Sequence, residues 1–177
     1  YLDAADLDEA DRHLLARPIN LFRGLANSPD GLDRFHAVGE WIRHESSVDA
    51  RLRELAILQI GYLTRSRYEY AHHIEIGRHF GVSDDDIRQV RTDRPLPAGP
   101  TGTVLRAARE LTLDQDLTDA TWQAMVDSVG VRQSVELVLV IAFYNAVIRV
   151  LAALAIDLEP DYQHYLDEFP LDQEGTP

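Results

Sequence analysis

Residues 50–79, ARLRELAILQIGYLTRSRYEYAHHIEIGRH, read as two helical stretches separated by a short polar turn. Apolar residues recur at helical spacing up to Leu63, and the second stretch begins after the turn near Thr64 and Arg65. In an antiparallel hairpin, positions equally far from the turn come opposite each other. Glu54 and His73 are such a pair, each about 14 Å below the turn at 1.5 Å per residue. The stretch therefore predicts a helical hairpin in which Glu54 faces His73.

The rest of the chain follows the same helical pattern. Ser28 and Pro29 suit the start of a helix over residues 29–44, and Asp49 suits the cap of the first hairpin helix. Gly81 is a typical stop for the second hairpin helix. Further helices are predicted over residues 83–90, 103–113, 118–129 and 131–156, with a proline- and glycine-rich linker at 94–102. No segment alternates as a strand would. The fold class is thus all-α, a single helical bundle.

Composition excludes several classes of function. The 177 residues carry a net charge of −13, which disfavours nucleic acids and anionic membranes as partners. The chain has no cysteine, so disulfides, thiolate metal sites and thiol nucleophiles are excluded. No signal peptide is visible in the acidic N-terminal residues. We expect a cytoplasmic protein.

Residues 135–156 form the most apolar part of the chain. Glu136, Asn145 and Arg149 interrupt this stretch, which favours a buried central helix over a membrane span. A helix that is apolar nearly all round needs neighbours on every face. A chain of this size has few helices to spare, so we expect a subunit interface to cover part of it and the protein to be an obligate homo-oligomer.

The densest group of ionisable side chains lies on the second hairpin helix. Glu69, His72 and His73 share one helical face. The Glu-x-x-x-His spacing occurs four times in the chain, so the spacing alone does not indicate chemistry. What distinguishes Glu69 and His73 is the apolar hairpin around them. Because apolar residues also surround Glu54, we expect a raised pKa there and an acid–base pair with His73; a buried structural pair is the alternative.

Other chemistries find less support in the sequence. Glu69 and His72 match half of a di-iron motif, but no second copy exists, and three ligands from one helical face would be strained. We expect no metal and no cofactor. Asn145 and Arg149 share a face of the last long helix, where Arg149 needs an anion or carbonyl groups. It either meets a carboxylate across a subunit interface or anchors a carboxylate substrate, and the neighbouring Tyr144 is expected to be core packing.

Two motifs resemble a known family. The stretches RELAIL at 53–58 and SRYEYAHH at 66–73, with looser similarity at 144–149, are similar to the carboxymuconolactone decarboxylase family and its alkylhydroperoxidase D-like relatives. The resemblance covers residues 19–158, leaving residues 1–18 as an N-terminal arm and 159–177 as a C-terminal tail. It implies an all-α fold of the alkylhydroperoxidase D type that forms trimers or hexamers.

The resemblance also implies site residues. The peroxidase branch has cysteines at the positions of Ser66 and Glu69, so thiol-dependent peroxide reduction is chemically excluded here. The decarboxylase-like branch implies catalysis by Glu54, Glu69 and His73, with His73, paired to Glu69, as polariser or proton donor and Glu54 as its shuttle. Candidate substrate-binding residues are Ser66, Tyr68, His72, Asn145 and Arg149.

The function predicted is therefore proton transfer at carbon. A cofactor-free decarboxylase, lyase or isomerase would act on a small carboxylic acid or lactone, as in the breakdown of aromatic rings. The alternatives are a non-catalytic helical oligomer or binding module, in which the Glu/His cluster only satisfies buried polar groups, and a metal-dependent oxygenase or hydrolase.

Overall fold

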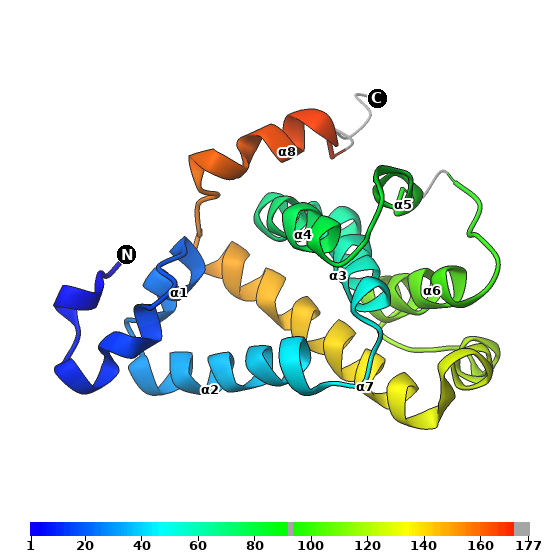
Figure 1. The fold of residues 1–177 in the computed structure, drawn as a ribbon, viewed down its shortest axis with the longest axis horizontal. Coiled ribbons are helices and arrows are strands. Elements are labelled where there is room, and N and C mark those ends of the chain that lie inside the picture. Colours follow the sequence, from blue (N-terminus) through cyan, green and yellow to red (C-terminus); the bar gives the residue numbers. More distant parts are fainter. Residues whose placement is uncertain (92–93, 172–177) are drawn as a thin grey trace.

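The computed structural model describes residues 1–91 and 94–171, and every regular element within these ranges is a helix (Figure 1). Helix α3 (Ala50–Leu63) is the central element. It packs against α4 (Arg67–His79), α6 (Pro100–Leu113) and α7 (Asp119–Ala153). Most residues of α3 are buried as a result, charged ones included. The predicted all-α class is confirmed.

The hairpin of α3 and α4 forms where the sequence predicts it. The Asp49 side chain accepts a hydrogen bond from the backbone of Leu52 and caps α3. Near the turn the two helices come close together at Gly61, where a Cβ atom would lie only 3.1 Å from the backbone of Tyr70. A side chain at position 61 would push the helices apart, so this glycine sets their spacing.

A second layer is built by α1 (Asn20–Leu25) and α2 (Pro29–Glu40). Pro29 occupies the first turn of α2, as predicted. After Glu40 the helical backbone continues as one π-helical turn, Trp41–Glu45, close to the predicted end at residue 44. The last carbonyls of a helix have no partner within it and are available to other donors.

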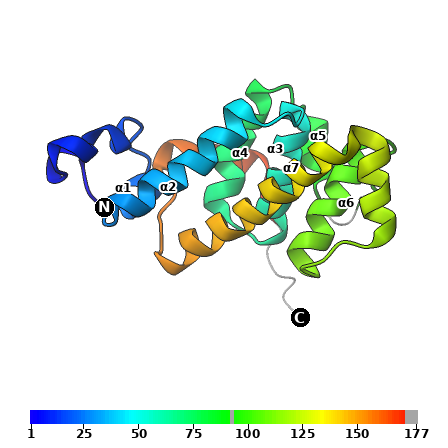
Figure 2. The same cartoon turned by 90° about the horizontal axis from the view of Figure 1, so that it is seen from below.

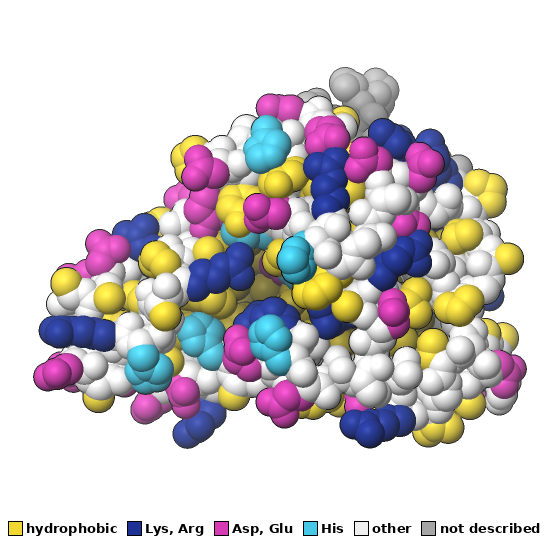
Figure 3. Space-filling model, viewed as in Figure 1, with side chains coloured by type: hydrophobic (Ala, Val, Ile, Leu, Met, Phe, Trp, Pro, Cys, Tyr) yellow, Lys and Arg dark blue, Asp and Glu magenta, His cyan; other side chains and the backbone are white. Residues whose placement is uncertain are grey.

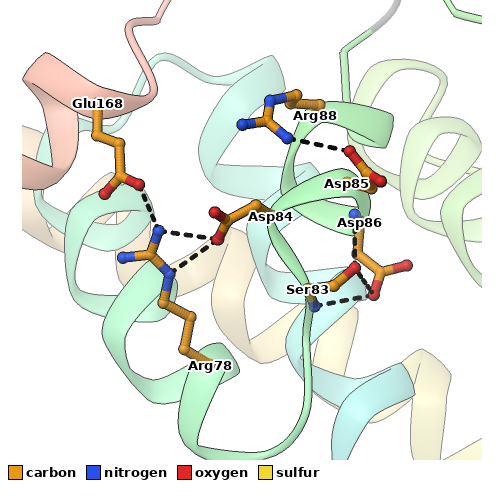
Figure 4. Close-up of polar contacts among 7 residues, drawn as sticks. All are labelled: Arg78, Ser83, Asp84, Asp85, Asp86, Arg88 and Glu168. Atoms are coloured by element: carbon orange, nitrogen blue, oxygen red, sulfur yellow. Dashed lines mark hydrogen bonds and ion pairs between the residues drawn. The ribbon is translucent and has the colours of Figure 1, made fainter.

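Charged side chains fix the short helices around α4. Arg78 of α4 binds Asp84 of α5 (Asp84–Gln89) and Glu168 of α8 (Gln163–Glu168), as Figure 4 shows. Ser83 and Asp86 form a reciprocal cap at the start of α5. The predicted linker is shorter than expected, because α6 begins at Pro100 rather than at residue 103.

Helix α7 is broken at Gly130, whose φ of 81° and ψ of 164° lie outside the helical region. This is the expected boundary between the last two helices. Beyond it, Val135 and Leu139 are exposed, in line with the prediction of an apolar helix that this subunit does not cover completely. Within the described residues α7 alone is long and apolar enough to cross a membrane, and 44% of its most apolar window is buried inside the fold.

The described N-terminal and C-terminal segments both contribute buried residues to the core. The N-terminal segment contains two 3-10 helices, Ala4–Asp6 and Glu9–Leu15, and projects at one end of the molecule (Figures 1 and 2). Leu14 and Leu15 are nevertheless buried. After α7 the chain passes through the 3-10 turn Pro160–Tyr162 into α8, which buries Leu166. The last part of the predicted tail, 172–177, lies outside the described residues.

Candidate active site

The hairpin brings Glu54 of α3 against His73 of α4, as the turn geometry predicts. Glu54 Oε2 lies 2.6 Å from His73 Nδ1, and the two side chains are only 2% and 7% exposed. On the other edge of the ring, His73 Nε2 lies 2.9 Å from Glu69 Oε1. A single buried imidazole is therefore held between two carboxylates.

Arg53 completes this arrangement from the next position on α3. Its Nε donates to Glu54 Oε1 at 2.9 Å, and its Nη1 faces the carbonyl oxygens of Ile42 and Arg43 at 3.3 and 3.4 Å. These carbonyls belong to the π-helical turn after α2. The guanidinium also lies over the ring of Phe80, 5.0 Å from its centroid. Both oxygens of Glu54 thus have fixed partners.

The electrostatics of the pair differ from the expectation for Glu54. Burial would raise the pKa of Glu54, but the imidazole of His73 and the guanidinium of Arg53 outweigh burial and hold it below the ordinary value of 4.5. Burial would likewise lower the pKa of His73, yet Glu54 and Glu69 raise it to about 9. The expectation of a raised pKa for Glu54 is wrong. The apolar neighbours seen in the sequence raise this pKa less than the two positive partners, His73 and Arg53, lower it. At neutral pH the proton belongs to the imidazole.

The three groups lie at the wall of a cavity between α1, α2, α4 and α7, with a volume of about 60 Å³. Its polar walls are lined by Arg17, His36, Arg43, Glu54, Tyr68, Glu69, His72, His73 and Tyr144, and its apolar walls by Ile19, Leu21, Phe22, Phe35, Ile76, Phe143 and Val147. The face seen in Figure 3 is hollowed near its centre, with apolar side chains inside and basic side chains and histidines around the hollow. Space of this size holds roughly two water molecules, so a larger ligand must extend through the mouth.

A second histidine links the cavity to the C-terminal segment. His72 Nε2 lies 2.8 Å from Glu159 Oε2, and its ring is stacked between Tyr68 and Tyr162. Glu159 also accepts hydrogen bonds from the Tyr68 hydroxyl at 3.1 Å and from the backbone of Asn20 at 2.6 Å. Burial lowers the pKa of His72 more than Glu159 raises it, so this imidazole is neutral at pH 7.

Comparisons with known proteins show a sequence similarity to one family and a shared fold. Residues 29–112 match the sequence profile of the Carboxymuconolactone decarboxylase family. The match covers 84 of the 177 residues and shows that this part of the chain is similar to the family. The structure is also similar to the crystal structure of an alkylhydroperoxidase AhpD core, an uncharacterized peroxidase-related protein from Ralstonia eutropha JMP134, with a TM-score of 0.77. That likeness spans 93% of this chain and 92% of the other at 16% identity, which shows a shared fold. No curated protein matched the chain.

The matched segment contains Glu54, Glu69 and His73, the residues that meet at the cavity wall. Because the chain has no cysteine, it lies outside the thiol-dependent branch of this fold. Glu159 lies beyond the matched region, yet it bonds to a histidine that lines the cavity.

The other predicted binding residues are divided between two places. Tyr68 and His72 line the cavity, whereas Ser66 and Arg149 line a separate groove on the far side of Tyr68. Arg149 donates from Nη1 to the carbonyl of Asn145, one of the partners expected for it. The structure therefore does not bring Ser66 or Arg149 to the cavity that holds His73.

Asn145 has a structural environment. Its amide nitrogen donates to the Thr112 hydroxyl and to the Ile141 carbonyl, both at 3.0 Å, and Asn145 does not line the cavity. Tyr144, expected to be core packing, is buried but also lines the cavity, with its ring edge-on to His73 at 5.1 Å between centroids.

Sequence reasoning missed the contribution of α2 and its π-helical turn. His36 and Arg43 line the cavity, and Arg53 positions Glu54. Arg53 directly precedes Glu54 in sequence, and this adjacency was the one available signal. Among residues 1–91 and 94–171, no cluster of three His, Asp or Glu side chains is arranged to hold a metal ion.

Proposed function

We propose that the protein is a cofactor-free acid–base enzyme, a decarboxylase, other carbon–carbon lyase or isomerase, acting in the cytoplasm on a small carboxylic acid or lactone. One observation carries the proposal. A buried imidazole, protonated up to about pH 9, is held between two carboxylates at the wall of a cavity. The similarity of residues 29–112 to the Carboxymuconolactone decarboxylase family supports the same reaction class.

The geometry supports a different role for each end of the imidazole. Nδ1 faces Glu54, which is buried, ionised and fixed by Arg53. Glu54 therefore stabilises the imidazolium and holds its orientation, in place of the proton-shuttle role expected from the sequence. Nε2 faces Glu69, which lines the cavity. Glu69 is thus the terminal group that exchanges a proton with the substrate, and His73 supplies that proton.

For decarboxylation, the bond between the carboxylate and the lactone ring breaks and carbon dioxide leaves. The electron pair stays on the substrate as a dienolate. The apolar walls favour loss of the leaving carboxylate's charge, because they solvate it poorly. The anion then takes a proton at carbon from Glu69, which receives it from His73 Nε2. His73 regains a proton from solvent after product release. An isomerisation would use the same two groups to move a proton between carbons.

The test is turnover of a panel of lactone acids, followed by carbon dioxide release and by ultraviolet absorbance. Removing a positioned acid–base group is expected to lower kcat by about 10² to 10⁴ fold in Glu69→Gln and His73→Ala. Glu45→Gln, an exposed carboxylate outside the cavity, is the matched control and should keep full activity. Full activity in both site variants would refute these roles. No turnover of any acid, with sharply lowered melting temperatures in both variants, would favour a non-catalytic binding module.

We also propose that a second copy of the chain covers the exposed face of α7. Val135 and Leu139 lie on this face together with the exposed Ala142 and Ala146, giving a continuous apolar stripe. Continuous exposed apolar surface of this kind marks protein interfaces. Native mass spectrometry should detect trimers or hexamers, and Leu139→Glu should dissociate them. A monomeric wild-type mass would contradict this part of the proposal.

A further inference from the structure

The wall of the cavity formed by α2 and its π-helical turn carries basic groups for which the proposed chemistry has no use. His36 comes from α2 and Arg43 from the turn after it, whereas the acid–base groups come from α3 and α4. Both side chains line the same cavity as His73. Their position indicates a role in holding the ligand.

The guanidinium of Arg43 packs against Gly39. A Cβ atom on Gly39 would lie 3.2 Å from Nη1 of Arg43 and 3.5 Å from Nη2. The missing side chain at position 39, itself on the cavity wall, therefore makes room for the guanidinium. Arg43 Nη2 also pairs with Glu40 at 2.5 Å, and Glu40 is 57% exposed, so this partner lies on the solvent side. The guanidinium is thus held in place between the cavity and the surface.

His36 offers a polar atom that lacks a protein partner. Its Nε2 is buried and has no hydrogen-bond partner within the part of the chain that the structure describes. Phe22 packs edge-on against the ring, with centroids 4.3 Å apart. Burial, and secondarily Arg43, lowers the pKa of His36, so the ring is neutral and one of its nitrogens carries a hydrogen. Buried polar atoms in folded proteins are normally satisfied, which points to a ligand or water at Nε2.

The charges of the wall favour an anion. Arg17, Arg43 and the imidazolium of His73 face the two carboxylates of Glu54 and Glu69. Three positive and two negative groups thus line the cavity in a chain whose net charge is −13, while Glu40, the partner of Arg43, lies on the solvent side. The remaining walls are mainly apolar and aromatic, which suits a ligand with an apolar body and one charged end.

We propose that Arg43 and His36 form the carboxylate-binding end of this cavity, and that its ligand is a small acid which keeps that carboxylate throughout the reaction. Arginine binds carboxylates with charge-assisted hydrogen bonds, and His36 Nε2 donates a further one. A carboxylate held in this way is stabilised in its charged form and so is a poor leaving group. Any carboxylate lost as carbon dioxide must lie elsewhere on the substrate, toward Glu69 and the apolar wall. That the bound acid is the substrate rests on the proposed function, whereas its binding by Arg43 and His36 does not.

The test compares crotonate with crotonamide, its neutral analogue of similar shape, by NMR titration of the protein. Wild type should bind crotonate at least about tenfold more tightly than crotonamide, since a hydrogen bond to a charged group contributes that much or more. Arg43→Met should abolish this preference and leave crotonamide affinity within about twofold, and Arg43→Lys should keep part of it. Gly39→Ala should weaken crotonate binding by displacing the guanidinium. Arg34→Met, on the same helix and 84% exposed, is the matched control and should change nothing.

Equal affinities for the two probes in wild type would overturn the inference, even if Arg43→Met fails to fold. An Arg43→Met protein that folds and retains the preference for crotonate would overturn it as well. Arg43-dependent binding of crotonate without turnover of any lactone acid would support this inference while refuting the proposed enzyme. Turnover of a lactone acid without any preference for crotonate over crotonamide would support the proposed enzyme while refuting this inference.

Discussion

Glu54 and His73 are nineteen residues apart in the sequence and their side chains meet at 2.6 Å, almost wholly shielded from solvent. Buried ions of opposite charge are costly to separate, because each would be left without a partner in a poorly polar environment. Arg53 and Glu69 extend the pair at its two ends. The stability and the reactivity of the hairpin therefore depend on the same few groups.

The first prediction concerns the dependence of stability on pH. The pKa of His73 rises from an ordinary 6.5 to about 9 on folding, so its contribution is fully present below pH 6.5 and is lost as pH rises through 9. The pKa of Glu54 falls on folding, so its contribution is present above 4.5 and is lost as pH falls through the folded value. Urea midpoints measured from pH 3 to 10.5 should decline at both ends. A midpoint that stays constant between pH 7 and 10 would contradict the shift at His73.

The second prediction concerns Arg53. Arg53→Met removes the partner of Glu54 Oε1 and the donor to two carbonyls of the π-helical turn. We expect a loss of about 3 to 5 kcal/mol in the free energy of unfolding, as for other broken buried ion pairs. Arg53→Lys should lose less. The control Arg34→Met, 84% exposed, should change the free energy by less than about 0.5 kcal/mol. A similar small effect of Arg53→Met in urea denaturation would show that the guanidinium does not stabilise the site.

A third prediction concerns the attachment of the C-terminal segment. Glu159 accepts hydrogen bonds from Asn20 and Tyr68 and lies against His72, so Glu159→Ala removes all three contacts. Hydrogen exchange in residues 160–169 should accelerate at least tenfold, and the free energy of unfolding should fall by about 1 to 3 kcal/mol. Glu45→Ala, exposed and remote from the tail, is the control. Unchanged exchange in the tail would mean that Arg78 and the buried apolar residues of α8 hold it without Glu159.

Periodicity and capping residues were sufficient to predict α2 to α7, whereas the short helices α1 and α8 were not predicted. Asp49 caps α3, and Gly130 breaks the long last helix where the sequence indicates. The hairpin register followed from the turn alone, because a two-helix hairpin leaves little freedom in which residues face each other. This is why the contact of Glu54 with His73 was predictable without knowledge of the rest of the fold.

The remainder of the site depends on contacts that local sequence does not specify. Arg43 reaches the cavity through a π-helical turn and the absence of a side chain at Gly39, and neither feature has a reliable sequence signal. Glu159 reaches His72 from eighty-seven residues away. The pKa of Glu54 could not be predicted from its apolar neighbours, since its sign is set by His73 and Arg53 together. Conversely, Arg149 was placed in the site on the strength of its apolar helix, and the structure puts it in a different groove.

The most direct test of the account is the titration of the His73 ring, followed by NMR of the imidazole nitrogens and carbons in wild type and in Glu54→Gln. We predict that wild-type His73 keeps its proton up to about pH 9 and that Glu54→Gln loses it at a clearly lower pH, while Glu45→Gln titrates as wild type does. A wild-type His73 that titrates at or below 6.5, or one whose titration is unaffected by Glu54→Gln, would contradict the proposed proton donor.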